Sequence, residues 1–286
     1  MMFGGKATDG SEEEVEVAAP YSGRVLWAYL IVQISVFAGL AWKYEFFLLA
    51  DQVYHRLPLS DPFFPAWLQS ADVIRWAYLG SLTAIVLGVV GMLPWIRMLC
   101  GLTQVGCLAV MLLHQGSHND MTFATSLWAS IWVFWFATRM DRDEPADLLR
   151  RGAFLGRAIA SMILLGGAVG KWTPEYWSGE VFYDIYFRER DFWVFNYLRE
   201  TYDAETLRGI ATWYSRKVIA VETLFGFALW LLPPRWAAAA GVTIFFSIAF
   251  FSNNLLYSVL LAMIGLSAVG FFVPKSMNDS STRATG

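Results

Sequence analysis

Eight long apolar stretches dominate this chain and decide what it can fold into. They span residues 25–44, 73–93, 96–113, 123–138, 154–170, 218–232, 236–251 and 255–273. Each is close to the length that a helix needs to cross a hydrocarbon core of ~30 Å at ~1.5 Å per residue. Lipid offers no hydrogen-bond partners to free backbone groups, so spanning segments are helices or closed barrels. These runs are continuous rather than alternating, which disfavours a β-barrel. We therefore predict an all-α polytopic membrane protein with about eight transmembrane helices, in contact with membrane lipid.

The composition agrees with this prediction and narrows the class of partner. Hydrophobic residues make up 57% of the chain and charged residues 16%, against about 45–50% and about 25% in ordinary globular proteins. This balance excludes a disordered chain, a coiled coil and a soluble sandwich. The net charge of −3 gives no support for a nucleic-acid partner.

Polar segments divide the chain into three parts. Residues 1–20 carry five acidic side chains and one lysine, without the basic region of a signal peptide, and we predict a disordered acidic tail. Residues 275–286 form a second polar tail, and the transmembrane domain covers 21–274. Inside that domain, residues 172–217 mix aromatic and charged side chains. We expect this segment to form a small non-cytoplasmic cap of amphipathic helices.

Orientation follows from the cations in the short loops. An even number of spans places both termini on one side, and the total count of lysines and arginines does not separate the two sides. Four arginines lie within the short loop 139–151, and cytoplasmic loops are enriched in such residues. We expect both termini to be cytoplasmic, in a bacterial inner membrane. His55, His114, His118 and Lys171 then lie on the other side.

Two histidines could act as metal ligands. His114 and His118 are four residues apart, so a helix would place both imidazoles on one face, with Asp120 or His55 as additional ligands. However, Gly116 and Ser117 lie between them, and no zincin motif is present. Two histidines that bond to neighbouring groups at a helix end are the favoured interpretation.

Lys171 and Glu222 are ionisable residues at or inside apolar stretches. Lys171 follows a Gly-rich stretch and precedes Trp172. It could extend to the lipid headgroups, or burial could leave a neutral amine that acts as a base. Glu222 lies inside the sixth stretch, where a carboxylate is a functional candidate. Pairing with Lys217 or Arg216 is an equally good interpretation.

The segment around Lys171 resembles a known family. Residues 167–179 read GAVGKWTPEYWSG, which is similar to the hallmark of the horizontally transferred transmembrane domain (HTTM) family. Its best-known members are the vitamin K-dependent gamma-carboxylases. The resemblance implies that Lys171 matches their catalytic lysine and that His118 matches their essential histidine. Residues 253–258 resemble the start of the family's last span and include Asn253, although Phe250 stands where the carboxylases have a histidine.

The resemblance also implies a chemistry. In the carboxylases a quinol is oxygenated, and the strong base that results takes a proton from a peptidyl glutamate. The cofactor implied here is an isoprenoid quinol, with Trp172, Trp177, Tyr183 and Asn253 as residues around its headgroup. A more distant likeness connects Lys171, Trp177 and Gly179 to the smaller DoxX-like proteins, which are linked to quinone or thiol redox partners.

Three functions remain open at this point. The first is a quinol-dependent membrane enzyme related to the gamma-carboxylases, with Lys171 as base, His118 in support and its site on the periplasmic or lumenal face. The second is a non-catalytic membrane component that binds a protein partner through residues 172–217. The third, a transporter or channel, is the weakest, because few polar residues lie inside the stretches: Gln33, Gln104 and Glu222 are the main ones.

Overall fold

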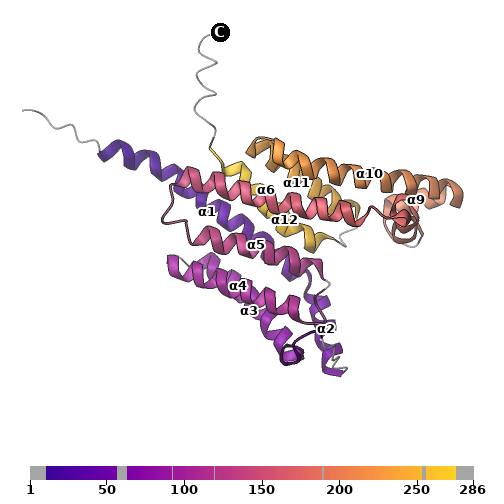
Figure 1. Cartoon of the computed structure of the whole chain (residues 1–286), viewed down its shortest axis with the longest axis horizontal. Coiled ribbons are helices and arrows are strands. Elements are labelled where there is room, and N and C mark those ends of the chain that lie inside the picture. Colours follow the sequence, from indigo (N-terminus) through magenta and orange to yellow (C-terminus); the bar gives the residue numbers. More distant parts are fainter. Residues whose placement is uncertain are drawn as a thin grey trace, which may run out of the picture.

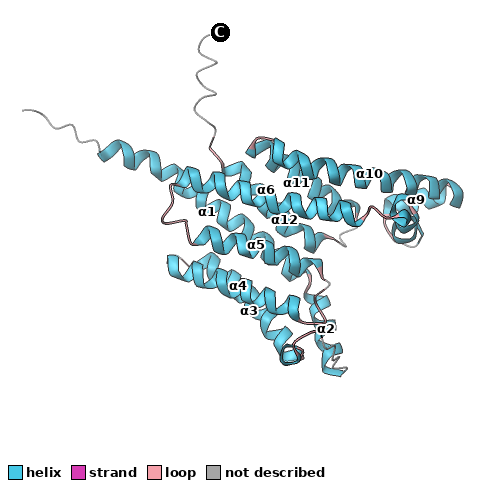
Figure 2. Ribbon diagram, in the orientation of Figure 1, coloured by secondary structure: helices cyan, strands magenta, loops and turns pink. Residues whose placement is uncertain are grey.

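The computed structural model describes residues 11–56, 63–91, 93–118, 120–188, 190–252 and 256–274. Within these ranges every regular element is a helix and none is a strand (Figure 2). The prediction of an all-α fold is confirmed for this part of the chain. Asn253 and the tail 275–286 lie outside the described residues, as do residues 1–10. The helix α1 begins at Ser11, inside the stretch that we expected to be a tail.

The helices form an elongated bundle (Figure 1). Their bounds are α1 Ser11–Trp42, α2 Tyr44–Arg56, η1 Ala66–Leu68, α3 Ala71–Val90, α4 Pro94–Leu113, α5 Met121–Ala137, α6 Pro145–Gly170, α7 Pro174–Trp177, α8 Glu180–Phe182, η2 Tyr183–Arg188, α9 Trp193–Thr201, α10 Ala204–Leu231, α11 Pro234–Phe251, α12 Tyr257–Ala268 and η3 Val269–Phe272. The short α12 packs against α1, α5, α6 and α11, and the hairpin of α3 and α4 packs beside α5. A large apolar core drawn from these helices holds the bundle together.

Local sequence signals set many of the helix ends. Proline occupies the first turn of α4, α6 and α11, where its missing N–H costs no hydrogen bond. Side chains of Ser70, Asp120, Glu144 and Asp203 accept hydrogen bonds from the first-turn N–H groups of α3, α5, α6 and α10. These signals do not all coincide with the predicted stretches: α6 begins at Pro145, before the stretch 154–170, and α2 lies in the polar segment that follows the first stretch.

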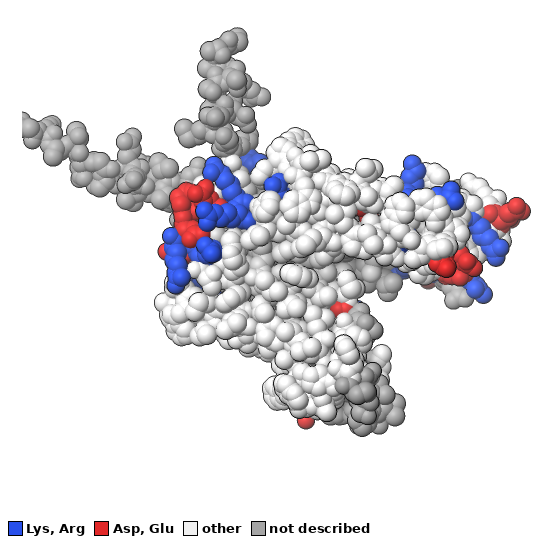
Figure 3. Space-filling view, in the orientation of Figure 1, with Lys and Arg blue, Asp and Glu red and all other residues white. Residues whose placement is uncertain are grey.

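Five of the described helices are long and apolar enough to cross a membrane. They are Gly23–Trp42 within α1, Ala71–Val90, Pro94–Leu113, Pro145–Gly170 and Pro234–Phe251. Two further apolar helices, Met121–Ala137 and Tyr257–Phe272, are shorter. On the face seen in Figure 3, lysine, arginine and acidic side chains gather mainly toward the two ends of the long axis, with an almost uncharged surface between them. These features indicate an integral membrane protein.

The sixth predicted stretch is part of a longer helix. α10 runs unbroken over 28 residues from Ala204 to Leu231, so its last part covers the apolar stretch and its first part belongs to segment 172–217. We expected a boundary between Lys217 and Val218, and the structure has none there. The pattern of exposed and buried side chains continues through it.

The rest of segment 172–217 packs onto the first part of α10. A second apolar cluster joins α8, η2 and α9 to α10 through Phe182, Phe187, Phe195, Leu207 and Ala211. In the turn between α7 and α8, the backbone at Gly179 lies close to the backbone of α10 at Thr212. Gly179 has φ of 83°, and a Cβ on it would lie 2.4 Å from the Thr212 backbone, so this position requires glycine.

Candidate functional site

A buried ion pair joins the C-terminal end of α6 to the middle of α10. The Lys171 ammonium donates to both carboxylate oxygens of Glu222, at 3.0 and 2.8 Å, and to the main-chain carbonyl of Gly167 at 3.2 Å. The side chains are 23% and 9% exposed. These three bonds use the full donor capacity of an ammonium group. The Lys171 nitrogen therefore has three polar partners, two of them on Glu222.

This pairing answers one question that the sequence left open. Glu222 binds a cation, but the cation is Lys171 rather than Lys217 or Arg216. The Lys217 ammonium lies over the Trp213 ring at 5.2 Å, and the Arg216 guanidinium lies over the Trp177 ring at 5.7 Å. The Lys171 side chain therefore contacts a carboxylate and a main-chain carbonyl as well as the apolar cavity.

A cavity of about 250 Å³ lies against the ion pair. Its walls come from the end of α6, from α8 and η2, and from the facing sides of α10 and α11. Most of the lining residues are apolar or aromatic: Phe182, Tyr186, Tyr214, Val218, Val221, Ile244, Ile248, Phe251 and Leu256. The polar and charged lining residues are Lys171, Lys217, Glu222, Ser247 and Ser252. Apolar walls with a few convergent polar groups are typical of a small-molecule site.

Arg190 ties segment 172–217 to the end of α11. Its guanidinium donates to the main-chain carbonyl of Ser252 and lies over the Tyr186 ring at 5.0 Å. Beside this contact, the rings of Phe192 and Phe250 meet edge to face at 5.9 Å. Both Tyr186 and Ser252 line the cavity. Arg190 therefore holds two of the cavity walls together.

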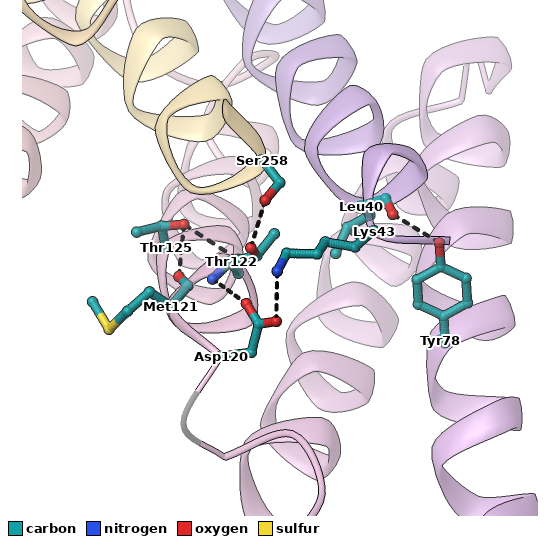
Figure 4. Close-up of polar contacts among 8 residues, drawn as sticks. All are labelled: Leu40, Lys43, Tyr78, Asp120, Met121, Thr122, Thr125 and Ser258. Atoms are coloured by element: carbon teal, nitrogen blue, oxygen red, sulfur yellow. Dashed lines mark hydrogen bonds and ion pairs between the residues drawn. The ribbon is translucent and has the colours of Figure 1, made fainter. Parts of the chain in front are cut away.

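A second polar cluster lies where α1, α5 and α12 meet (Figure 4). The Lys43 ammonium lies 2.9 Å from the Asp120 carboxylate, whose side chain is 8% exposed. Asp120 also caps α5 by accepting from the Thr122 N–H at 2.8 Å. The Thr122 hydroxyl lies 2.9 Å from the Ser258 hydroxyl at the start of α12. Asp120 thus has structural partners for both roles, as an ion-pair member and as a helix cap.

The two histidines after α4 have different surroundings. His114 is fully buried, and its Nδ1 accepts from the Gly116 N–H at 3.2 Å. Burial lowers the pKa of this imidazole. The His118 ring contacts Phe64 at 4.8 Å, and its Nδ1 lies 2.9 Å from the Gln115 carbonyl. In the part of the chain that the structure covers, no group of three or more His, Cys, Asp or Glu side chains is arranged to hold a metal ion.

The predicted site residues are only partly brought together. Lys171 lines the cavity, whereas His118, Trp172, Trp177 and Tyr183 are not among its lining residues. The rings of Trp172 and Trp177 stack on each other at 5.2 Å and are 61% and 42% exposed. Tyr183 packs under the Arg208 guanidinium at 5.2 Å. The aromatic surfaces next to Lys171 come instead from Phe182, Tyr186 and Tyr214.

Comparison with known proteins gave no relatives. No protein-family model, no curated protein and no solved structure matches this chain.

Proposed function

We propose that the cavity beside Lys171 and Glu222 binds the headgroup of an isoprenoid quinol. The observation that carries this proposal is a buried ion pair facing a cavity with aromatic walls. The rings of Phe182, Tyr186 and Tyr214 offer flat apolar surfaces to a quinol ring. The Glu222 carboxylate offers a hydrogen-bond acceptor to one quinol hydroxyl group. The resemblance of residues 167–179 to the HTTM family supports the same ligand class.

The proposed chemistry is proton transfer from the quinol to Glu222. Glu222 accepts the proton from a quinol hydroxyl, so that an O–H bond of the quinol breaks and a carboxyl O–H bond forms. The Lys171 ammonium then stabilises the quinolate oxygen. This assignment differs from a role of Lys171 as base, because the nitrogen of Lys171 already binds Glu222 and Gly167. The resemblance implies molecular oxygen as the oxidant of the quinolate and a gamma-carboxylase-like reaction.

Substitution of Lys171 by arginine separates the two roles. An arginine stays protonated at any working pH and cannot act as a base. If Lys171 stabilises an anion, Lys171→Arg retains part of the quinol turnover, while Lys171→Met loses it. Equal loss in both variants would support the base role instead.

Native mass spectrometry of the purified protein tests the ligand directly. We expect a prenylated quinone to be retained by the wild type and lost from Lys171→Met and Glu222→Gln. Lys43→Met is the matched control, because it removes a lysine from a second ion pair with a buried carboxylate, that with Asp120, and it should retain the quinone. If Lys171→Met and Glu222→Gln retained the quinone as Lys43→Met does, the ligand would bind elsewhere and the proposal would be refuted.

We further propose eight transmembrane helices, with both termini cytoplasmic and segment 172–217 as a non-cytoplasmic cap. A helix lies at each of the eight apolar stretches, and charged side chains gather at the ends of the bundle. Engineered cysteines at Asp9 and Asp279 test the orientation. A membrane-impermeant thiol reagent should modify neither position in intact cells. Labelling of either position would contradict the proposed orientation.

A second candidate function is supported by the outer surface of segment 172–217. The α9 residues Trp193 and Tyr197 are 68% and 63% exposed, and exposed aromatic side chains are frequent at protein interfaces. A non-catalytic component that assembles with a protein partner through this surface would keep its partner in Lys171→Met and lose it in Trp193→Ala. The quinol proposal predicts that the quinone is lost from Lys171→Met and retained by Trp193→Ala.

A further inference from the structure

The charges that line the cavity do not cancel. Two lysines and one glutamate belong to its walls, which gives a net charge of +1. Lys171 is neutralised by Glu222, whose two oxygens both bind it. Lys217 is different, because none of the ion pairs among the described residues includes it and its ammonium contacts the Trp213 ring. A cation on an aromatic face keeps most of its charge available to a further partner.

The other groups that face the cavity do not compensate for Lys217. Tyr186 on η2 and Tyr214 on α10 are phenols, and burial raises the pKa of both, so they remain neutral. α11 contributes the uncharged Ser247 and Ser252. Arg190 contacts the Tyr186 ring and the Ser252 carbonyl, and it adds a second positive charge beside these two lining residues.

We infer that the cavity selects an amphiphile with an anionic ring headgroup and that Lys217 is the residue that determines this preference. The inference rests on the proposed ligand site but goes beyond it, because it defines the charge of the ligand. A singly charged anion in the cavity brings the net charge of the lining residues to zero. The apolar walls strengthen this attraction relative to water, although the exposed Lys217 side chain is partly screened. The preferred class is therefore an aromatic acid or phenolate that carries an apolar chain, rather than its neutral form.

Matched probes test the preference for charge. 4-Decyloxybenzoate and its methyl ester have the same ring and chain, and only the acid is charged at neutral pH. Their binding to the full-length protein is measured by calorimetry in an uncharged maltoside detergent. We expect the wild type to bind the acid about tenfold more tightly than the ester, as a partly screened charge pair of about 1.4 kcal/mol gives.

The variants assign the preference to one residue. Lys217→Gln should reduce the acid-to-ester ratio to about twofold or less, and Lys217→Arg should preserve it, since the positive charge remains. Arg216→Gln is the matched control. It removes the same charge from the neighbouring position, but Arg216 donates to the Trp177 carbonyl and does not line the cavity. Both positions are exposed, so the variants should fold, and a thermal melt checks this.

The outcomes separate this inference from the quinol proposal. Equal binding of acid and ester by the wild type, or equal loss in Arg216→Gln and Lys217→Gln, would overturn the inference. A short-chain benzoquinone is titrated in parallel. Binding of the acid without binding of the quinone overturns the quinol proposal alone. Binding of the quinone with no preference for the acid overturns the inference alone, and binding of neither overturns both.

Discussion

Replacing Glu222 by glutamine should destabilise the protein through Lys171. The change keeps the shape of the side chain and leaves a charged ammonium without its counter-ion. Removing one partner of a fully buried ion pair costs about 3–5 kcal/mol. Lys171 retains 23% exposure of its side chain and can recover part of its hydration, so we expect about 2–3 kcal/mol. For a chain of this size the loss corresponds to roughly 5–10 °C in melting temperature.

A double-mutant cycle in detergent provides the assay. Lys171→Met should also destabilise, because it leaves Glu222 unpaired. The double variant Lys171→Met/Glu222→Gln should be more stable than the sum of the two single effects predicts, because neither charge remains unpaired. Asp184→Asn is the control. It breaks the ion pair between Asp184 and Arg188, whose side chains are 54% and 63% exposed respectively. Such exposed pairs contribute little to stability.

Additive single effects would refute the reasoning, because additivity means that the two side chains do not interact. An unchanged melting temperature in Glu222→Gln would refute it as well. If Asp184→Asn caused a loss equal to that of Glu222→Gln, burial would not be the cause of the difference.

Three further predictions concern other parts of the structure. Asp120→Asn keeps an oxygen to cap α5 but removes the charge that faces Lys43 at 2.9 Å, so the melting temperature should fall by several degrees, whereas an unchanged value would contradict a stabilising pair. The pKa of His114 lies below its ordinary value of 6.5 in the folded chain; the unfolded chain therefore binds more protons, and stability should be constant above about pH 6.5 and fall below it. His114→Gln should flatten this dependence between pH 5 and 7 in thermal melts, and an unchanged slope would assign it to another group. Gly179→Ala would place a Cβ 2.4 Å from Thr212 and should loosen the packing of α7 and α8 on α10, seen as faster proteolysis within segment 172–217; unchanged proteolysis would contradict the need for glycine.

The helices could be predicted from the sequence because their apolar runs are long and their end signals are local. The proline starts of α4, α6 and α11 and the caps Ser70 and Asp120 all lie within one turn of the helix they begin. The continuity of α10 was not predicted. Charged residues such as Lys217 interrupt its hydropathy, although they stack on neighbouring rings and leave the helix intact.

Of the residues in the candidate site, Lys171 was the one that the sequence identified most directly. Lys171 was identified from its position after an apolar Gly-rich run. Its partner Glu222 lies 51 residues away in the sequence. No local sequence pattern predicts that α10, which carries Glu222, packs against α6. The sequence placed Trp172 and Trp177 next to Lys171, but they stack on each other outside the cavity. Tyr186 and Tyr214 reach the cavity because η2 and α10 fold together through the second apolar cluster, which is a long-range property.

The most direct measurement of the central claim is an anaerobic absorbance titration of the protein with a short-chain benzoquinol. The proposed site binds the quinol and moves its proton to Glu222 beside the Lys171 ammonium. The wild type should therefore give more quinolate absorbance than the free quinol gives at the same pH, and this increase should saturate at one ligand per chain. Glu222→Gln should not produce this increase, because its amide cannot accept the proton. Saturable binding with no quinolate in the wild type, or an undiminished quinolate signal in Glu222→Gln, would contradict the account.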